Sequence, residues 1–153
     1  MAMKSLHLLR HAKSSWKDPG LNDHDRPLSK RGRQTAKMMA AYLRRAKIAP
    51  DLVICSTAMR ARQTLDPIAK AKKPPKVVLE REIYGGAQRA LWEQLWNLPE
   101  SAKSVLLIAR PRRLEQAAQR RPVENFRRVQ WRVSASMEHG RRWSRKALCS
   151  PHI

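Results

Sequence analysis

Two clusters of polar side chains each follow a short apolar run. The first is Arg10-His11-Ala12-Lys13-Ser14-Ser15, directly after Leu6, Leu8 and Leu9. The second is Ser56-Thr57-Ala58-Met59-Arg60-Ala61-Arg62, directly after the apolar residues 52–55. Such runs favour buried strands, and ligands of open α/β sheets bind beyond the carboxyl ends of the strands. We therefore expect the two clusters to meet at one edge of a sheet, although an Arg-His pair alone also fits a polar turn.

Together the clusters supply guanidinium, imidazole and hydroxyl groups that suit a phosphoryl group. The planar guanidiniums of Arg10 and Arg60 donate paired hydrogen bonds and stay charged at any working pH. The neutral imidazole of His11 can attack phosphorus and carry the phosphoryl group until water removes it. The arginines would stabilise the charge on the equatorial oxygens during both transfers. Because they supply positive charge, we predict no metal ion and no cofactor.

The chain up to Ile108 alternates strands and helices that would position these clusters. Ser29 is placed to cap a helix over residues 30–46, whose periodic apolar residues form one buried face. The other expected elements are strands at 52–55, 76–79 and 104–108, helices over 59–72 and 87–98, and a turn at 83–86. Repeated strand–helix alternation predicts the α/β class, with a mainly parallel sheet and right-handed crossovers.

This pattern stops after Ile108. Residues 109–153 are rich in Arg, contain scattered Trp and show no sustained period of either kind. A short helix over 114–119 is the single element expected there, and none is expected after Pro122. We therefore divide the chain into an α/β domain, 1–108, and an atypical Arg-rich tail, 109–153.

The charge of the chain is strongly positive. Lys and Arg total 33 against 12 Asp and Glu, which gives a net charge of +21. An excess of this size suggests a polyanionic partner. The segment from Lys103 onward, however, holds 13 basic and 3 acidic residues, so the charge is densest where the periodic pattern is absent. Total charge is therefore a weak indicator of function.

Cellular location is indicated by three absences in the sequence. No apolar run approaches the ~18 residues that span a bilayer, and no export signal precedes the first strand. Cys55 and Cys149 form neither a metal-binding spacing nor a disulfide framework. We expect a cytoplasmic protein without a membrane partner.

Three blocks of sequence resemble, in order, the histidine phosphatase superfamily and more narrowly its phosphohistidine phosphatase branch, SixA. They are Leu9-Arg10-His11-Ala12-Lys13-Ser14-Ser15-Trp16, Asp25-Arg26-Pro27-Leu28-Ser29-Lys30-Arg31-Gly32 and Cys55-Ser56-Thr57-Ala58-Met59-Arg60-Ala61-Arg62-Gln63-Thr64. The resemblance covers the chain from about Leu6 to Ile108. It implies a three-layer α/β/α fold like that of phosphoglycerate mutases, and a phosphorylated protein or small phosphoester as substrate.

The resemblance also implies roles for the first and third blocks. His11 would be the phosphorylated nucleophile, and Arg10 and Arg60 would bind phosphate. The chain departs from the family after the strand at 104–108, where the family has a second histidine in Gly-His-Asn-Pro-Gly or a close variant. Arg110 stands in that place, where it can bind phosphate but cannot exchange a proton as histidine does. The other histidines, His7, His24, His139 and His152, lie in no matching context.

Three further side chains are candidates with an equal structural alternative. Glu82 lies in a segment resembling the place of the proton donor in larger family members, although a solvated carboxylate fits it as well. Ser14 would contact phosphate or only satisfy backbone groups, and Arg62 would contact substrate or stay on the helix surface. The second block, with Asp25, Arg26 and Arg31, is interpreted as fixing a loop.

The tail is consistent with a shifted reading frame. Codons permitted for residues 124–133 allow Lys-Phe-Pro-Thr-Gly-Ala-Met-Ala when each third base is read with the next two. That octapeptide resembles the segment that the family places after its second histidine. On this hypothesis the tail is foreign to the fold and poorly ordered, which also accounts for the Arg excess and the missing histidine.

Three functions stay open on the sequence alone. The leading one is a metal-independent phosphatase acting through a phosphohistidine at His11. The second is a catalytically impaired family member that binds a phosphorylated ligand, because the second pocket histidine is missing. The third is a basic nucleic-acid-binding protein. We disfavour nucleic acid as a partner because no reader module is recognisable and Trp131 and Trp143 sit on no patterned platform.

Overall fold

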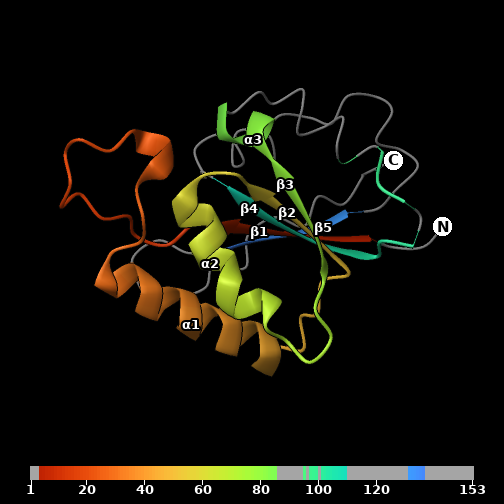
Figure 1. The fold of residues 1–153 in the computed structure, drawn as a ribbon. Helices are drawn as coiled ribbons and strands as arrows, with labels where there is room; N and C mark the ends of the chain where they lie inside the picture. Colours follow the sequence, from red (N-terminus) through yellow and green to blue (C-terminus); the bar gives the residue numbers. More distant parts are fainter. Residues whose placement is uncertain (1–3, 86–94, 96, 100, 110–130, 137–153) are drawn as a thin grey trace.

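The computed structural model describes residues 4–85, 95, 97–99, 101–109 and 131–136, and Figure 1 shows their arrangement. They form a parallel five-stranded sheet in the order β3-β2-β4-β1-β5. The strands are β1 Lys4–Arg10, β2 Leu52–Ser56, β3 Lys76–Glu80, β4 Ser104–Ala109 and β5 Trp131–Ser136. The helices are the short 3-10 helix η1 Asp23–Asp25 and the α-helices α1 Lys30–Arg45, α2 Met59–Ala69 and α3 Arg81–Gly85.

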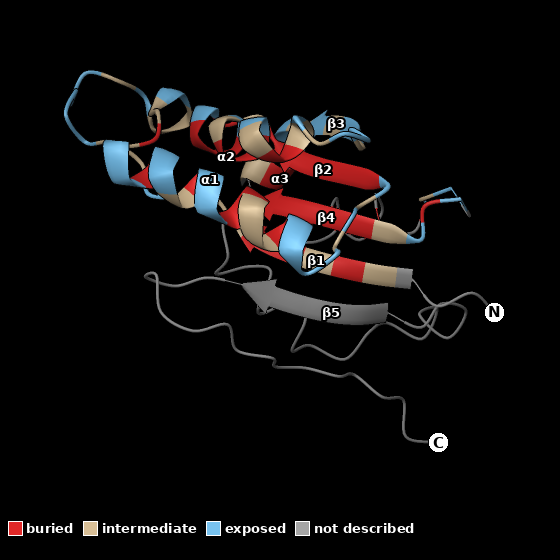
Figure 2. Ribbon diagram, turned by 90° about the horizontal axis from the view of Figure 1, so that it is seen from below, coloured by how far each residue is buried: buried red, intermediate tan, exposed pale blue. Residues whose placement is uncertain are grey.

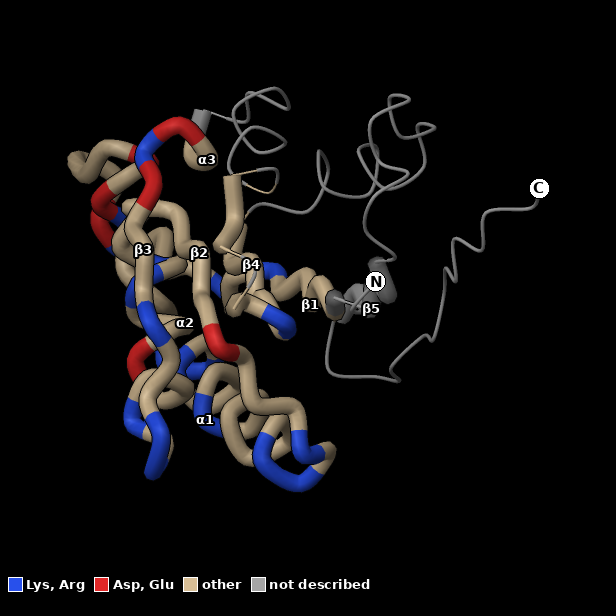
Figure 3. Tube along the Cα trace, turned by 90° about the vertical axis from the view of Figure 1, so that its right-hand side faces the viewer, with Lys and Arg blue, Asp and Glu red and all other residues tan. Residues whose placement is uncertain are grey.

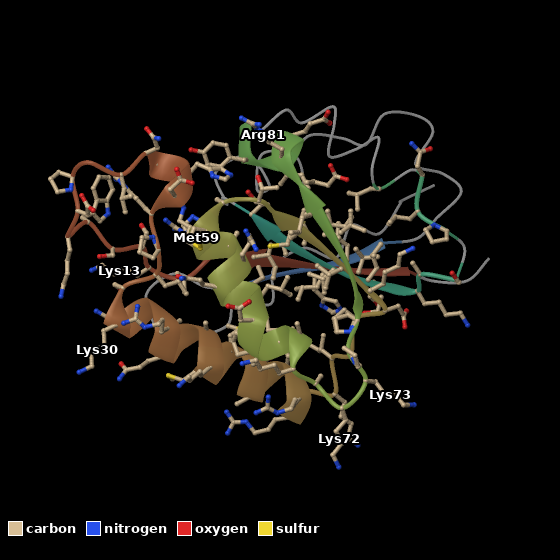
Figure 4. The ribbon with its side chains drawn as sticks, viewed as in Figure 1. Lys13, Lys30, Met59, Lys72, Lys73 and Arg81 are labelled. Carbon is tan, nitrogen blue, oxygen red and sulfur yellow. The ribbon has the colours of Figure 1, made fainter. Side chains whose placement is uncertain are left out.

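Alternate residues of the central strands pack on opposite faces of the sheet. Leu9, Val53, Cys55, Leu106 and Ile108 share one core with the apolar faces of α1 and α2. Leu6, Leu8, Ile54, Val105 and Leu107 form a second core, which also holds Ile83 of α3 and Leu95. Strands buried on both faces read as continuous apolar runs, which is why β2 and β4 were visible in the sequence. Figure 2 shows both strands as buried, with α1 and α2 on the same side.

The α/β class with a parallel central sheet is confirmed, and several element boundaries agree with the sequence. Ser29 caps α1, because its hydroxyl accepts a hydrogen bond from the Gly32 N–H at 3.0 Å. Helix α2 ends at Ala69, three residues earlier than expected. No helix in the described ranges is long and apolar enough to cross a bilayer.

Two local predictions are wrong. The turn expected at 83–86 is instead the short helix α3, in which Ile83 occupies a buried position. The segment after Pro122 was expected to hold no regular element, yet β5 pairs in parallel with β1 along its whole length. Its six residues, Trp-Arg-Val-Ser-Ala-Ser, alternate apolar and polar types, a strand signal that is easily missed in an Arg-rich context without a continuous apolar run.

Some predictions lie outside the described residues. The helix over 87–98 falls there for the most part, although the described Leu95 is buried and Leu98 packs partly buried against the same core. The short helix over 114–119 lies outside as well. The division of the chain after residue 108 and the shifted reading frame stay predictions.

Candidate active site

The two polar clusters lie together at the carboxyl ends of β1 and β2. A surface pocket is lined by His11, just after β1, by Ser56 at the end of β2, and by Ala58, Arg60 and Ala61 around the start of α2. Helix α3 adds Ile83 and Tyr84 from the far side. Parallel strands deliver their following residues to one edge of the sheet, which explains why clusters 49 positions apart share this pocket.

Two hydrogen bonds fix the proton arrangement of His11. The imidazole Nδ1 lies 2.9 Å from the carbonyl oxygen of Ala12, and a carbonyl oxygen can only accept, so Nδ1 carries the hydrogen. The guanidinium Nε of Arg60 donates to the imidazole Nε2 at 3.2 Å, so Nε2 presents its lone pair. His11 is therefore held as the neutral tautomer with Nε2 available as a nucleophile.

Arg60 places a buried positive charge beside that nucleophile. Its side chain is 3% exposed, and its NH2 group forms an ion pair with the Oδ2 atom of Asp23 at 2.8 Å. The NH1 group donates to the backbone carbonyl of Asp23. A buried guanidinium needs such partners because removal from water is costly for a charge. Asp23 is thus the internal anion that balances Arg60.

Helix α2 also fixes the loop that carries His11. The buried Thr64 hydroxyl accepts from the Ala12 N–H at 3.0 Å and donates to the Arg60 carbonyl at 2.7 Å. Thr64 therefore links Ala12, which follows His11, to Arg60, which donates a hydrogen bond to His11. Gln63 extends the same role, since its Oε1 accepts from the Leu28 N–H at 2.6 Å. These contacts explain the polar residues at the end of the third block.

Helix α1 packs closely against the loop after His11, with the backbone of Gly32 next to the backbone of Lys13. A Cβ atom on Gly32 would lie 2.2 Å from the carbonyl oxygen of Lys13, so only glycine fits there. The same carbonyl accepts from the N–H and the hydroxyl of Ser29, at 2.9 and 3.1 Å. Ser14 pairs with Leu28 as an isolated antiparallel bridge. The second block of the sequence therefore forms the cradle for the first.

The η1 turn adds acidic and imidazole groups at the pocket. Tyr84 donates its hydroxyl to the Asp23 Oδ2 atom at 3.0 Å, and its ring meets the ring of His24 edge-on, with centroids 4.8 Å apart. His24 contacts Thr57 through Nε2 at 3.0 Å and Asp25 through Nδ1 at 3.1 Å. Figure 1 shows η1 beside the start of α2 and near α3, in agreement with these contacts.

The remaining predicted site residues lie at different distances from this centre. Arg10 ends β1 and is half-buried, immediately before His11. Ser14 is half-buried in the cradle, whereas Arg62 is exposed on α2. Glu82 is exposed in the first turn of α3, from which Ile83 and Tyr84 line the pocket. Arg110 lies outside the described residues.

Sequence reasoning missed three participants, namely Asp23, His24 and Tyr84. They come from a loop and from a segment interpreted as a turn, where no periodicity marks which side chains point inward. The signal available was the pair of acidic residues that flank His24, directly before and at the start of the second block. Of the residues interpreted as fixing the loop, Arg26 stacks its guanidinium 3.7 Å above the Trp16 ring.

The sequence of this chain matches a known protein family. The sequence model of the histidine phosphatase superfamily (branch 1) matches residues 6–148. The chain belongs to this superfamily. The match extends well beyond Ile108, into the segment that the sequence analysis set apart as a tail.

Several relatives agree with this membership. An uncharacterized protein of Mycobacterium tuberculosis is 39% identical over 100 residues, which are 65% of this chain and 61% of that protein. A candidate phosphohistidine phosphatase SixA from Agrobacterium tumefaciens is 31% identical with a TM-score of 0.67, over 73% of this chain and 72% of that one. A protein histidine phosphatase SixA complexed with tungstate is 25% identical with a TM-score of 0.59, over 72% and 71%. The chain thus spans about three fifths of the length of the curated relative.

In the described site, the guanidinium of Arg60 and the neutral imidazole of His11 are in direct contact. This pair suits a phosphoryl group, whose oxygens meet a positive donor while its phosphorus meets a nitrogen lone pair.

Proposed function

We propose that this protein is a phosphatase that takes a phosphoryl group onto Nε2 of His11 and passes it to water. The observation that carries the proposal is the hydrogen bond from Arg60 Nε to His11 Nε2, which presents the imidazole lone pair beside a buried cation. Family membership supports the same chemistry.

The first step is an in-line displacement at phosphorus. His11 Nε2 forms the P–N bond while the bond from phosphorus to the leaving group breaks on the opposite side. Arg60 stabilises the negative charge on the equatorial oxygens through its guanidinium N–H groups, and Arg10, next to His11, adds a second positive charge. When the phosphoryl group binds, Arg60 gives up its hydrogen bond to Nε2, which frees that lone pair for the attack, and exchanges part of its pairing with Asp23 for the substrate oxygens.

The second step returns the enzyme to its starting state. Water attacks phosphorus, the P–N bond breaks, and the electron pair returns to Nε2 of His11. The Nδ1–H bond to the Ala12 carbonyl is kept throughout, so the ring stays oriented in both steps. The two arginines supply the positive charge, so the proposed steps require no metal ion.

The proposed substrates are phosphohistidine-bearing proteins or small phosphomonoesters. Two of the similar structures carry the name SixA, and one of them was solved with tungstate, a tetrahedral oxyanion of the same shape as phosphate. The pocket lies at the surface, and half-buried His11 lines it, so a phosphorylated side chain on another protein can reach it.

Turnover of p-nitrophenyl phosphate in the presence of a metal chelator tests this proposal. We expect steady release of nitrophenol by the wild type and none by His11→Ala. Lys37→Ala, which alters an exposed residue of α1, serves as the control and should match the wild type. If folded wild-type protein binds tungstate but shows no turnover, the proposed phosphatase activity is overturned and the phosphate-binding alternative is supported.

A further inference from the structure

We propose that His24 is the general acid that protonates the leaving group when His11 takes the phosphoryl group. The proposal deepens the proposed function and rests on it. It assigns to His24 a role for which Glu82 was the candidate from sequence, and it starts from the contacts of His24 with residues in and beside the pocket lining.

The first observation is the position of His24. Its ring packs edge-on against Tyr84, with an interplanar angle of 82°, and Tyr84 lines the same pocket as His11. The residue before it, Asp23, holds the buried guanidinium of Arg60. His24 therefore directly follows Asp23, whose carboxylate contacts Arg60, and its ring contacts Tyr84, which lines the pocket.

The second observation is the chain of hydrogen bonds through the imidazole. The Asp25 carboxylate can only accept, so the 3.1 Å contact with Nδ1 means that Nδ1 carries a hydrogen. The Thr57 hydroxyl at 3.0 Å from Nε2 is able to accept a second N–H. Both N–H groups of a protonated His24 thus have acceptors. A carboxylate that accepts from one imidazole nitrogen fixes the orientation of the ring and leaves the other nitrogen to face a proton acceptor.

The third observation is the placement of Glu82. Its side chain is exposed in the first turn of α3, and the pocket-lining residues of that helix are the two that follow it, Ile83 and Tyr84. A general acid must come within hydrogen-bond reach of the leaving atom. His24 also lies outside the lining, but its ring contacts Tyr84 of the lining and its Nε2 contacts Thr57, which stands between the lining residues Ser56 and Ala58.

The proposed step balances as follows. His11 Nε2 forms the P–N bond, the bond from phosphorus to the leaving oxygen or nitrogen breaks, and that atom receives the Nε2 proton of His24. The leaving atom replaces the Thr57 hydroxyl as the acceptor of this N–H. In the second step neutral His24 takes a proton from the attacking water, and the P–N bond breaks to restore His11.

The test compares two leaving groups in the full-length chain. The nitrophenolate of p-nitrophenyl phosphate departs without a proton, whereas the alkoxide of β-glycerophosphate needs one. We expect His24→Gln to lower kcat/KM for β-glycerophosphate about a hundredfold and to leave kcat/KM for p-nitrophenyl phosphate, which reports only the steps up to nitrophenolate release, near the wild-type value. Asp18→Asn, a change at an exposed carboxylate of the same loop, should alter neither rate.

Each other outcome has a distinct meaning. Equal losses on both substrates, or no loss on either, would overturn the role of His24. A selective loss in Glu82→Gln instead of His24→Gln would return the role to Glu82. Absence of turnover by the wild type on both substrates would overturn the proposed function and the role of His24 with it. Inhibition of His24→Gln by tungstate, at the same tungstate concentration that inhibits the wild type, verifies that the phosphate pocket of the variant is intact.

Discussion

Nε of Arg60 and Nε2 of His11 lie 3.2 Å apart, although the two residues are separated by 49 positions in the sequence. One residue follows β1 and the other opens α2, so the sheet brings them together. The contact also shows which imidazole nitrogen carries the lone pair, because Nε2 accepts the hydrogen bond from Arg60. Sequence motif, fold and chemistry therefore meet in this one hydrogen bond.

Replacing Arg60 by Lys tests the guanidinium itself. A single ammonium cannot contact His11, Asp23 and a phosphoryl oxygen at once, so kcat should fall about 10²–10³-fold. Initial rates with p-nitrophenyl phosphate measure this change. The same substitution at exposed Arg62 is the matched control and should keep most of the activity. Equal rates for Arg60→Lys and wild type would contradict the assignment.

Asp23→Asn should strengthen the binding of oxyanions. The carboxylate of Asp23 occupies the NH2 group of Arg60 and repels a second anion, whereas asparagine keeps an acceptor without the charge. Inhibition by tungstate, measured as a dissociation constant, should become several-fold tighter. Asp18→Asn on the same loop should leave the constant unchanged, and weaker binding by Asp23→Asn would show that the carboxylate mainly positions Arg60.

Gly32→Ala should impair both stability and activity. The new Cβ would lie 2.2 Å from the Lys13 carbonyl oxygen, so either α1 or the loop after His11 must move. Forced overpacking of this kind costs about 1–3 kcal/mol. Gly20→Ala is the control, because its Cβ would meet only the Asp18 side chain at 3.3 Å. Urea unfolding measures the difference, and equal midpoints for the two variants would contradict the close approach.

Cys55 should make stability fall on the alkaline side. Burial raises the pKa of its thiol to about 12, with a smaller upward contribution from Asp66 that Arg62 opposes. In the unfolded chain the thiol ionises near its usual pKa of 9.0. The folded state therefore holds the proton more tightly, and its advantage is full below about pH 9 and is lost as the pH rises toward 12.

The measurement is urea unfolding of wild type and Cys55→Ala at about pH 8 and about pH 11. The free energy of unfolding should fall more steeply with pH in the wild type than in Cys55→Ala, because the variant lacks the thiol. All other titrating groups are common to both proteins. Parallel pH dependences would show that Cys55 is not protected by burial.

The sequence predicted the elements whose apolar runs are continuous. The strands β1, β2 and β4 are buried on both faces, so their runs end abruptly where the site begins. This is why His11 and Arg60 were recognisable as neighbours. Edge strand β5 has no such run and was missed, although it pairs with β1.

The candidate site was predictable where chemistry and motif coincide and unpredictable where it depends on loop conformation. The partnership of Asp23 with Arg60 depends on the path of the chain through η1, and no local pattern encodes that path. The same holds for the ring contact between His24 and Tyr84. Gly32 was visible in the sequence as the end of the second block, but the reason for a glycine there is given only by the structure. Its backbone packs so closely on the Lys13 carbonyl that a Cβ atom would not fit.

Trapping the covalent intermediate tests the central claim most directly. Wild-type protein mixed with a radiolabelled aryl phosphate, then quenched and digested under alkaline conditions that preserve phosphohistidine, should yield one labelled peptide, the one containing His11. His11→Ala treated in the same way should yield no labelled peptide. Turnover by the wild type with no label at His11, or with label at another residue, would contradict the account.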